Sequence, residues 1–215
     1  MQTITLDKAV ALIPDGATLM IGGFMAVGTP ERLMDELVRQ GKKNLTVIAN
    51  DNALPGKGIG KLVSAGLVRR TITSHIGLNP ETQKKMNDGS MQVELVPQGT
   101  LIERIRAGGF GLGGILTRTG VGTMVEEGKR KIEVDGKDYL LETPLRADFA
   151  LVQAFLCDYS GNLTYALTAR NFNPLIAMAA ETVIVDAEHV VPVGLIPPDQ
   201  VVTPAPLVDY VIAHG

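Results

Sequence analysis

A glycine-rich segment between a short apolar run and a proline constrains this chain more than any other feature. Residues 15–30 read DGATLMIGGFMAVGTP, with glycines at Gly22, Gly23 and Gly28 and a proline at Pro30 that is typical of a helix start. Such a strand–loop–helix unit presents main-chain amides and a helix N-terminus, which bind anions. The segment predicts a site for a phosphate-bearing molecule at the carboxyl edge of a sheet. The alternative is that the glycines only allow a tight turn and close packing of the helix.

Short apolar strands alternate with helical segments over the first hundred residues. This order predicts an α/β fold, an open and mostly parallel sheet with helices on both faces, in one domain spanning residues 1–215. The predicted strands are 19–21, 45–49, 70–74, 93–96, 149–154, 162–165, 182–185 and 210–212. The predicted helices are 7–13, 30–40, 57–65, 80–88, 100–106 and 174–180, and those at 30, 80 and 174 begin with a capping residue followed by proline.

Two stretches depart from the alternation. Residues 107–122 hold seven glycines in sixteen positions, a density that predicts a long loop without regular structure, because glycine loses the most backbone entropy on ordering. Its apolar residues favour a lid or an interface over a mobile surface connection. Residues 131–142 alternate around Asp135-Gly136 and predict a small β-hairpin that leaves the main sheet.

Composition excludes several classes of protein. A formal net charge of −3 argues against a nucleic-acid-binding protein, which normally has a basic face. The chain has no apolar run near the ~18 residues of a membrane span, and Met1 is not followed by a signal-peptide pattern, so we expect a cytoplasmic protein. The single cysteine, Cys157, is expected to be a small buried side chain, and no Cys/His cluster predicts a metal site.

Polar residues follow two of the predicted strands. Asn50-Asp51-Asn52 comes after 45–49, and Gln98 comes after 93–96, so both face the ligand crevice of an open α/β sheet. The Gln98 amide could donate a hydrogen bond to a substrate carboxylate. The alternatives are an Asx-turn or a helix cap at 50–52, and a capping box between Thr100 and Glu103.

Taken in order, these segments resemble the α subunit of the family I coenzyme A-transferases. The nearest likeness is to acetate/butyrate:acetoacetate CoA-transferases, followed by the succinyl-CoA:3-oxoacid enzymes. Besides residues 15–30, the resemblance is carried by NDNA at 50–53, NPET at 79–82, PQGTLIERIRAGG at 97–109, TGVGT at 119–123, LRAD at 145–148 and ARNFNP at 169–174.

The resemblance implies an enzyme that moves CoA from an acyl thioester to a free carboxylate through a covalent glutamyl intermediate. In this family the glutamate belongs to a β subunit, in an SENG motif that the present sequence lacks. It therefore implies no catalytic nucleophile in this chain, and a β-subunit partner in an assembly that is usually α2β2. CoA and acyl-CoA are substrates, and no prosthetic group is implied.

The resemblance also assigns binding residues. It maps the CoA-binding loop of the family onto Gly22, Gly23, Phe24, Met25, Ala26, Val27 and Gly28. It implies a substrate-binding role for Gln98, Asn52 and Asp51, although an aspartate would repel a substrate carboxylate unless it is neutral or paired.

Two other functions remain open from the residues alone: a non-catalytic module that binds a phosphorylated metabolite, and a phosphosugar isomerase. The sequence has no evident DNA-binding helix-turn-helix for the first and no evident carboxylate–lysine pair for the second.

Overall fold

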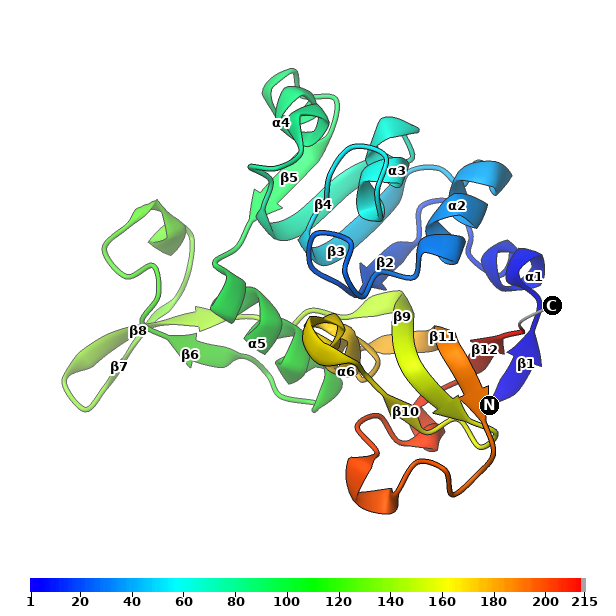
Figure 1. Cartoon of the computed structure of the whole chain (residues 1–215). Helices are drawn as coiled ribbons and strands as arrows, with labels where there is room; N and C mark the ends of the chain where they lie inside the picture. The colour runs from blue at the N-terminus through cyan, green and yellow to red at the C-terminus, as the bar shows by residue number, and fades with distance from the viewer. Residues whose placement is uncertain (214–215) are drawn as a thin grey trace.

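The larger sheet of the protein is open and parallel, as the sequence predicts. A computed structural model describes residues 1–213 (Figure 1). Within them the strand order is β1-β12-β11-β9-β2-β3-β4-β5, every one of these pairs is parallel, and β10 adds an antiparallel pair beside β9. The strands are β1 (Gln2–Ile4), β2 (Thr18–Ile21), β3 (Leu45–Asp51), β4 (Val68–His75), β5 (Gln92–Leu95), β9 (Ala147–Asp158), β10 (Leu163–Thr164), β11 (Ala180–Val191) and β12 (Tyr210–Ile212).

Helices cover both faces of this sheet. They are α1 (Leu6–Ala11), α2 (Glu31–Gln40), α3 (Ile59–Ser64), α4 (Pro80–Asn87), α5 (Gln98–Gly109) and α6 (Asn173–Ile176). Short 3₁₀ turns occur at η1 (Met124–Glu126), η2 (Leu167–Arg170), η3 (Pro198–Gln200) and η4 (Ala205–Leu207). Among the described residues, none of these helices has the length and apolar character needed to cross a membrane.

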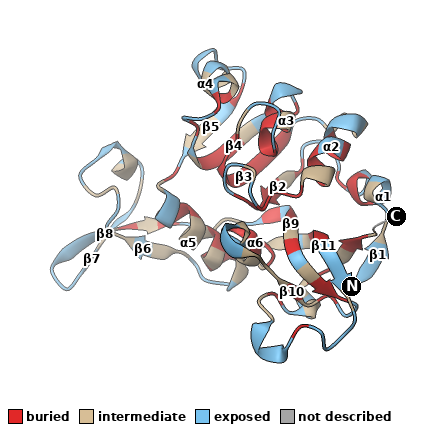
Figure 2. Cartoon of the chain, viewed as in Figure 1, coloured by how far each residue is buried: buried red, intermediate tan, exposed pale blue. Residues whose placement is uncertain are grey.

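The alternation of side chains along β2 explains the two layers. Leu19 and Ile21 lie in one hydrophobic core, together with buried residues of α1, α2 and α3. Met20, between them, points to the opposite core, which holds buried residues of α5 and α6. All three side chains are fully buried, which stabilises the fold by about 1.5–3 kcal/mol for each side chain. Figure 2 shows buried residues concentrated along the central strands.

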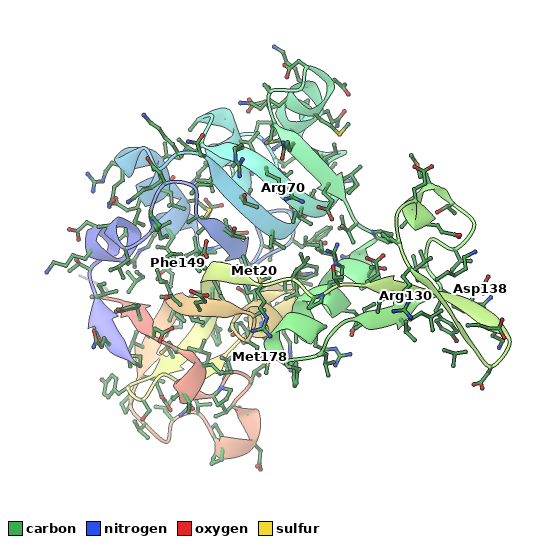
Figure 3. All side chains as sticks on the ribbon, turned by 180° about the vertical axis from the view of Figure 1, so that it is seen from behind. Met20, Arg70, Arg130, Asp138, Phe149 and Met178 are labelled. Carbon is green, nitrogen blue, oxygen red and sulfur yellow. The ribbon has the colours of Figure 1, made fainter. Side chains whose placement is uncertain are left out.

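A second, three-stranded sheet projects from the body of the protein (Figure 1). It consists of β6 (Ile115–Thr117), β7 (Lys131–Val134) and β8 (Lys137–Glu142), all antiparallel. β7 and β8 confirm the predicted hairpin, and positive φ angles at Asp135 and Gly136 give its two-residue turn. Arg130 and Asp138 lie on this arm, well away from Met20 in the body (Figure 3).

The prediction of a loop without regular structure over 107–122 is wrong. Helix α5 continues through Gly109, and β6 lies within the same stretch. The two helical glycines are required by close packing: a Cβ at Gly108 would stand 1.9 Å from the main-chain oxygen of Leu145, and one at Gly109 would stand 2.7 Å from Met178 Cβ. Tertiary contacts therefore offset the entropy that glycine loses in a helix.

The expected helix starts are confirmed at one position and wrong at two. Asn79 caps α4, because its side chain accepts the N–H of Thr82. Thr29 instead donates to the main-chain oxygen of Gly22, and α2 begins after Pro30 without a side-chain cap. Asn173 is the first residue of α6 and makes no capping bond, and α6 ends at Ile176 rather than at residue 180. The sequence patterns also missed β1 and β6.

Candidate functional site

The glycine segment forms a strained two-residue turn. The N–H of Phe24 donates to the oxygen of Val27 at 3.0 Å, and the N–H of Val27 donates back at 2.9 Å. The two residues between them, Met25 and Ala26, have φ angles of 50° and 71°. Non-glycine residues in this region cost about 1–3 kcal/mol each, a strain that is concentrated at functional sites.

Contacts within the chain explain why glycines flank this turn. A Cβ at Gly22 would stand 1.8 Å from Asn173 Oδ1, and one at Gly28 would stand 2.7 Å from the backbone of Ala169. Asn173 fills this space because its Nδ2 donates to the oxygens of Gly28 and Ala169, each at 2.8 Å. The close-packing alternative therefore accounts for these glycines whether or not a ligand approaches them.

The loop can bind a ligand through its main-chain N–H groups. Among the described residues, the N–H groups of Ala26 and Gly28 donate no hydrogen bond. The start of α2 is less suited to an anion, because its first residue is Glu31 and a carboxylate in the first turn already compensates the helix dipole. The chemistry available here is hydrogen bonding to a carbonyl oxygen or an oxyanion.

Asp51 supports this loop from the end of β3. Its carboxylate accepts the N–H of Met25 at 2.8 Å through one oxygen and the N–H of Ala53 at 2.7 Å through the other. The bond to Ala53 is the Asx-turn considered from the sequence. The side chain is buried. Each of its two oxygens therefore accepts one hydrogen bond from the main chain.

Asn52 lies apart from the other polar residues of the site. Its Oδ1 accepts the hydroxyl of Thr71 at 3.2 Å, and its main-chain oxygen accepts Asn79 Nδ2 at 3.0 Å. The residue is 1% exposed, and its Nδ2 has no partner among the described residues. The structure thus places Asp51 beneath the glycine loop and Asn52 in the interior between β4 and α4.

Gln98 is the first residue of α5, and Pro97 is the N-cap. The alternative of a capping box between Thr100 and Glu103 is wrong, because the helix starts two residues before Thr100 and Glu103 pairs with Arg106 instead. Gln98 Nε2 donates to Asn50 Oδ1 at 2.9 Å. The side chain is exposed at the carboxyl edge of the sheet, where sequence reasoning expected it.

Three residues complete the polar cluster around Gln98, and the first of them belongs to the segment 50–52 that the sequence predicts to face a ligand. Asn50 is buried, its Oδ1 lies 3.0 Å from Ser74 Oγ, and its Nδ2 lies 3.5 Å from Asn171 Oδ1. In the sequence, Ser74 is connected with this site only by its place near the end of β4, the strand next to β3. Asn171 comes from more than a hundred residues further on, and no local pattern connects it with this edge.

A cleft of about 560 Å³ adjoins the glycine loop and is lined by residues 26–32, 166–169 and 186–188, with Gln153. Three acidic residues border it, and each has a partner. Glu31 accepts the N–H of Gly58 at 2.8 Å and pairs with Lys61 at 2.6 Å. Asp186 lies 3.6 Å from Arg32, and Glu188 accepts Gln153 Nε2 at 3.1 Å. Two of the three carboxylates, those of Glu31 and Asp186, therefore face cations, and one of these cations, Arg32, also lines the cleft.

The coenzyme A transferase family model matches residues 3–214. The chain therefore belongs to the coenzyme A transferase family.

Two similar proteins are bacterial subunits of matching length. Acetate CoA-transferase subunit alpha of Escherichia coli (strain K12) is 56% identical over 98% of this chain and 96% of that protein. Acetoacetyl-CoA:acetate/butyrate CoA transferase alpha subunit of Clostridium acetobutylicum is 50% identical over 98% of this chain and 97% of that one.

A solved structure has the same fold in a longer chain. The acyl-CoA transferase YdiF of E. coli O157:H7, in a thioester complex with CoA, superimposes with a TM-score of 0.87 at 26% identity. The match covers 99% of the present chain but only 47% of YdiF, so this chain spans about half the length of that protein.

Proposed function

We propose that this chain is the α subunit of a two-subunit CoA-transferase that exchanges CoA between a short-chain acyl-CoA and acetate or acetoacetate. The observation that carries the proposal is the 56% identity, over 98% of the chain, to a protein named acetate CoA-transferase subunit alpha. The proposed site of action is the cytoplasm. CoA enters as a substrate, and the proposal includes no prosthetic group.

The nucleophile in this proposal is a glutamate of a β subunit. The acidic residues beside the glycine loop support this assignment, because Asp51 and Glu31 both accept main-chain N–H groups. Asp186 and Glu188 are likewise engaged, by Arg32 and Gln153. A carboxylate nucleophile has to be free to approach the thioester carbonyl. The assembly would be α2β2, with the active site completed at the contact between the two kinds of subunit.

The reaction then proceeds by covalent exchange. The partner's carboxylate attacks the acyl-CoA carbonyl, the C–S bond breaks, and CoA leaves as a thiolate from an acyl-glutamyl anhydride. The thiolate next attacks the glutamyl carbonyl, which forms a glutamyl-CoA thioester and releases the first acid. A second carboxylate reverses these two steps and leaves as the new acyl-CoA. Every bond that forms has a matching bond that breaks, and no redox step is needed.

The residues of this chain bind and orient the substrates. The loop from Gly22 to Gly28 would lie against the thioester, where the N–H groups of Ala26 and Gly28 could stabilise the oxyanion that develops on its carbonyl oxygen. Gln98 would donate to the carboxylate of the acid. Asp51 contributes by holding the loop rather than by contacting the acid, and Asn52 contributes through the packing beneath the site.

Co-expression with a β subunit tests the proposal. The isolated chain should have no CoA-transfer activity with acetoacetyl-CoA and acetate, and the reconstituted pair should be active. Borohydride reduction of the acyl-enzyme intermediate, followed by mass spectrometry, should place the adduct on the β subunit. An adduct on a glutamate of this chain, or full activity without the partner, would refute it. Parallel assays with acetate, butyrate and succinate rank the acids.

A further inference from the structure

A buried residue, Asn50, sets the orientation of the Gln98 side-chain amide. Gln98 is exposed, whereas Asn50 is 1% exposed. Among residues 1–213, the Gln98 side chain makes a single hydrogen bond, which runs from Nε2 to Asn50 Oδ1 at 2.9 Å. An amide NH₂ has two hydrogens. One is therefore directed at Asn50, and the second remains available at the exposed side.

Asn50 is itself held in place by its neighbours. Ser74 Oγ lies 2.7 Å from the main-chain oxygen of Asn50 and 3.0 Å from its Oδ1, and both are acceptors, so the hydroxyl proton is shared between them. Thr73 Oγ1 donates to the same main-chain oxygen at 3.0 Å. On the far side, Asn50 Nδ2 faces Asn171 Oδ1. The Asn50 side chain thus has its oxygen directed towards Gln98 and its nitrogen directed away.

We propose that Asn50 is a positioning residue, which keeps the Gln98 amide turned so that Nε2–H rather than Oε1 faces a substrate carboxylate. This inference rests on the proposed role of Gln98. Without Asn50 Oδ1 the amide can rotate by half a turn, and its carbonyl oxygen would then repel the carboxylate. Ser74 acts one step further back, because its hydroxyl helps to hold Asn50.

The test is a double-mutant cycle in the enzyme reconstituted with its β subunit. Asn50→Ala should raise the KM for acetate about three- to tenfold, the range expected when one hydrogen bond is lost. The KM for acetoacetyl-CoA should change less than about twofold by the same reasoning. In a Gln98→Leu background, Asn50→Ala should add little, since the two residues then act through one contact.

A matched pair of variants separates positioning from stability. Ser74→Ala removes a hydroxyl that bonds both the main chain and the side chain of Asn50, whereas Thr73→Val removes one that bonds the main chain alone. Ser74→Ala should raise the KM for acetate, and Thr73→Val should not, with both melting temperatures measured alongside. The pair also serves if Asn50→Ala fails to fold.

Three outcomes would overturn the inference, and they are distinguishable. If Gln98→Leu leaves the KM for acetate unchanged, the role proposed for Gln98 fails and the positioning role fails with it. If Gln98→Leu impairs acetate use but Asn50→Ala has its full effect in that background, the positioning role of Asn50 is refuted and the role of Gln98 stands. Equal KM changes for Ser74→Ala and Thr73→Val would indicate a merely structural role for this cluster.

Discussion

The carboxylate of Asp51 accepts the main-chain N–H of Met25 at 2.8 Å and thereby joins the end of β3 to the tip of the glycine turn. The same carboxylate accepts the N–H of Ala53 at 2.7 Å. One buried side chain thus stabilises two segments that are far apart in sequence. It also fixes a turn whose two central residues have positive φ angles.

Replacing Asp51 should release this turn. Asp51→Ala leaves two N–H groups without an acceptor, so we expect the free energy of unfolding to fall by about 1–3 kcal/mol. Asp51→Asn keeps one acceptor oxygen, so its free energy of unfolding should fall by less. Urea denaturation measures both variants. If the two variants are equally stable, the carboxylate does not support the loop.

Gly22 should not tolerate even a methyl group. Gly22→Ala would displace Asn173, whose Oδ1 lies 1.8 Å from the new Cβ position, and would disturb its bonds to Gly28 and Gln153. We expect a loss of about 1–3 kcal/mol of stability by thermal melting. Gly113→Ala is the matched control, because nothing lies within 4 Å of its Cβ position. Adding Asn173→Ala should relieve the clash, so a strictly additive double variant would contradict this explanation.

The projecting arm should depend on a buried carboxylate at its base. Glu142 is 3% exposed, pairs with Lys129 at 2.5 Å and lies 3.9 Å from Arg104 Nε. Glu142→Ala leaves both cations without this partner, so we expect a loss near the lower end of the about 3–5 kcal/mol found for broken buried pairs. Exposed Glu133 on the same arm is the control and should change stability by less than about 0.5 kcal/mol. Equal effects of the two replacements in urea would count against the ion pair.

Asp158 should contribute to stability in a pH-dependent way. Burial by itself would raise the pKa of its carboxyl, but hydrogen bonds from Asn162 and from the N–H groups of Ser160 and Gly161 outweigh burial and lower that pKa. A carboxyl with a lowered pKa in the folded state stabilises the protein above its unfolded pKa of about 3.9 and loses that effect as pH falls through the folded value.

Asp158→Asn should accordingly flatten the stability curve in acid. The variant should be less stable than the parent chain at pH 7, and the difference in unfolding free energy should narrow as pH falls below about 3.9 and through the lowered pKa of Asp158 in the folded protein. Denaturation at a series of pH values measures the gap. A constant difference across this range would show that the Asp158 charge is not responsible.

Cys157 should be unreactive in the native protein. Its side chain is fully buried, and burial, followed by the charge of Asp158, raises the pKa of the thiol to about 12. The thiolate is the reactive form, so almost none is present at neutral pH. Mass spectrometry after iodoacetamide treatment should find Cys157 unmodified in native buffer and modified in urea. Rapid labelling of the native chain would show that this strand opens easily.

Much of the architecture could be predicted from local pattern. The alternation of short apolar strands with helices predicted the parallel sheet, because the side chains of a buried strand such as Leu19, Met20 and Ile21 must all be apolar. The Asp135-Gly136 hairpin and the cap at Asn79 were equally local. Each of these features depends on neighbours within a few residues, which a sequence displays directly.

The tertiary structure decided what depends on contacts between distant segments. Helix α5 continues through Gly108 and Gly109 because the backbone at Leu145 and Met178 packs against them, and no local pattern records that contact. Asn173 read as a helix cap, yet it fills the space over Gly22, and Asn50 meets Gln98 only because β3 and α5 end at the same edge. Periodicity shows which side chains face a core, whereas the polar contacts of a site are made only after distant strands have been brought side by side.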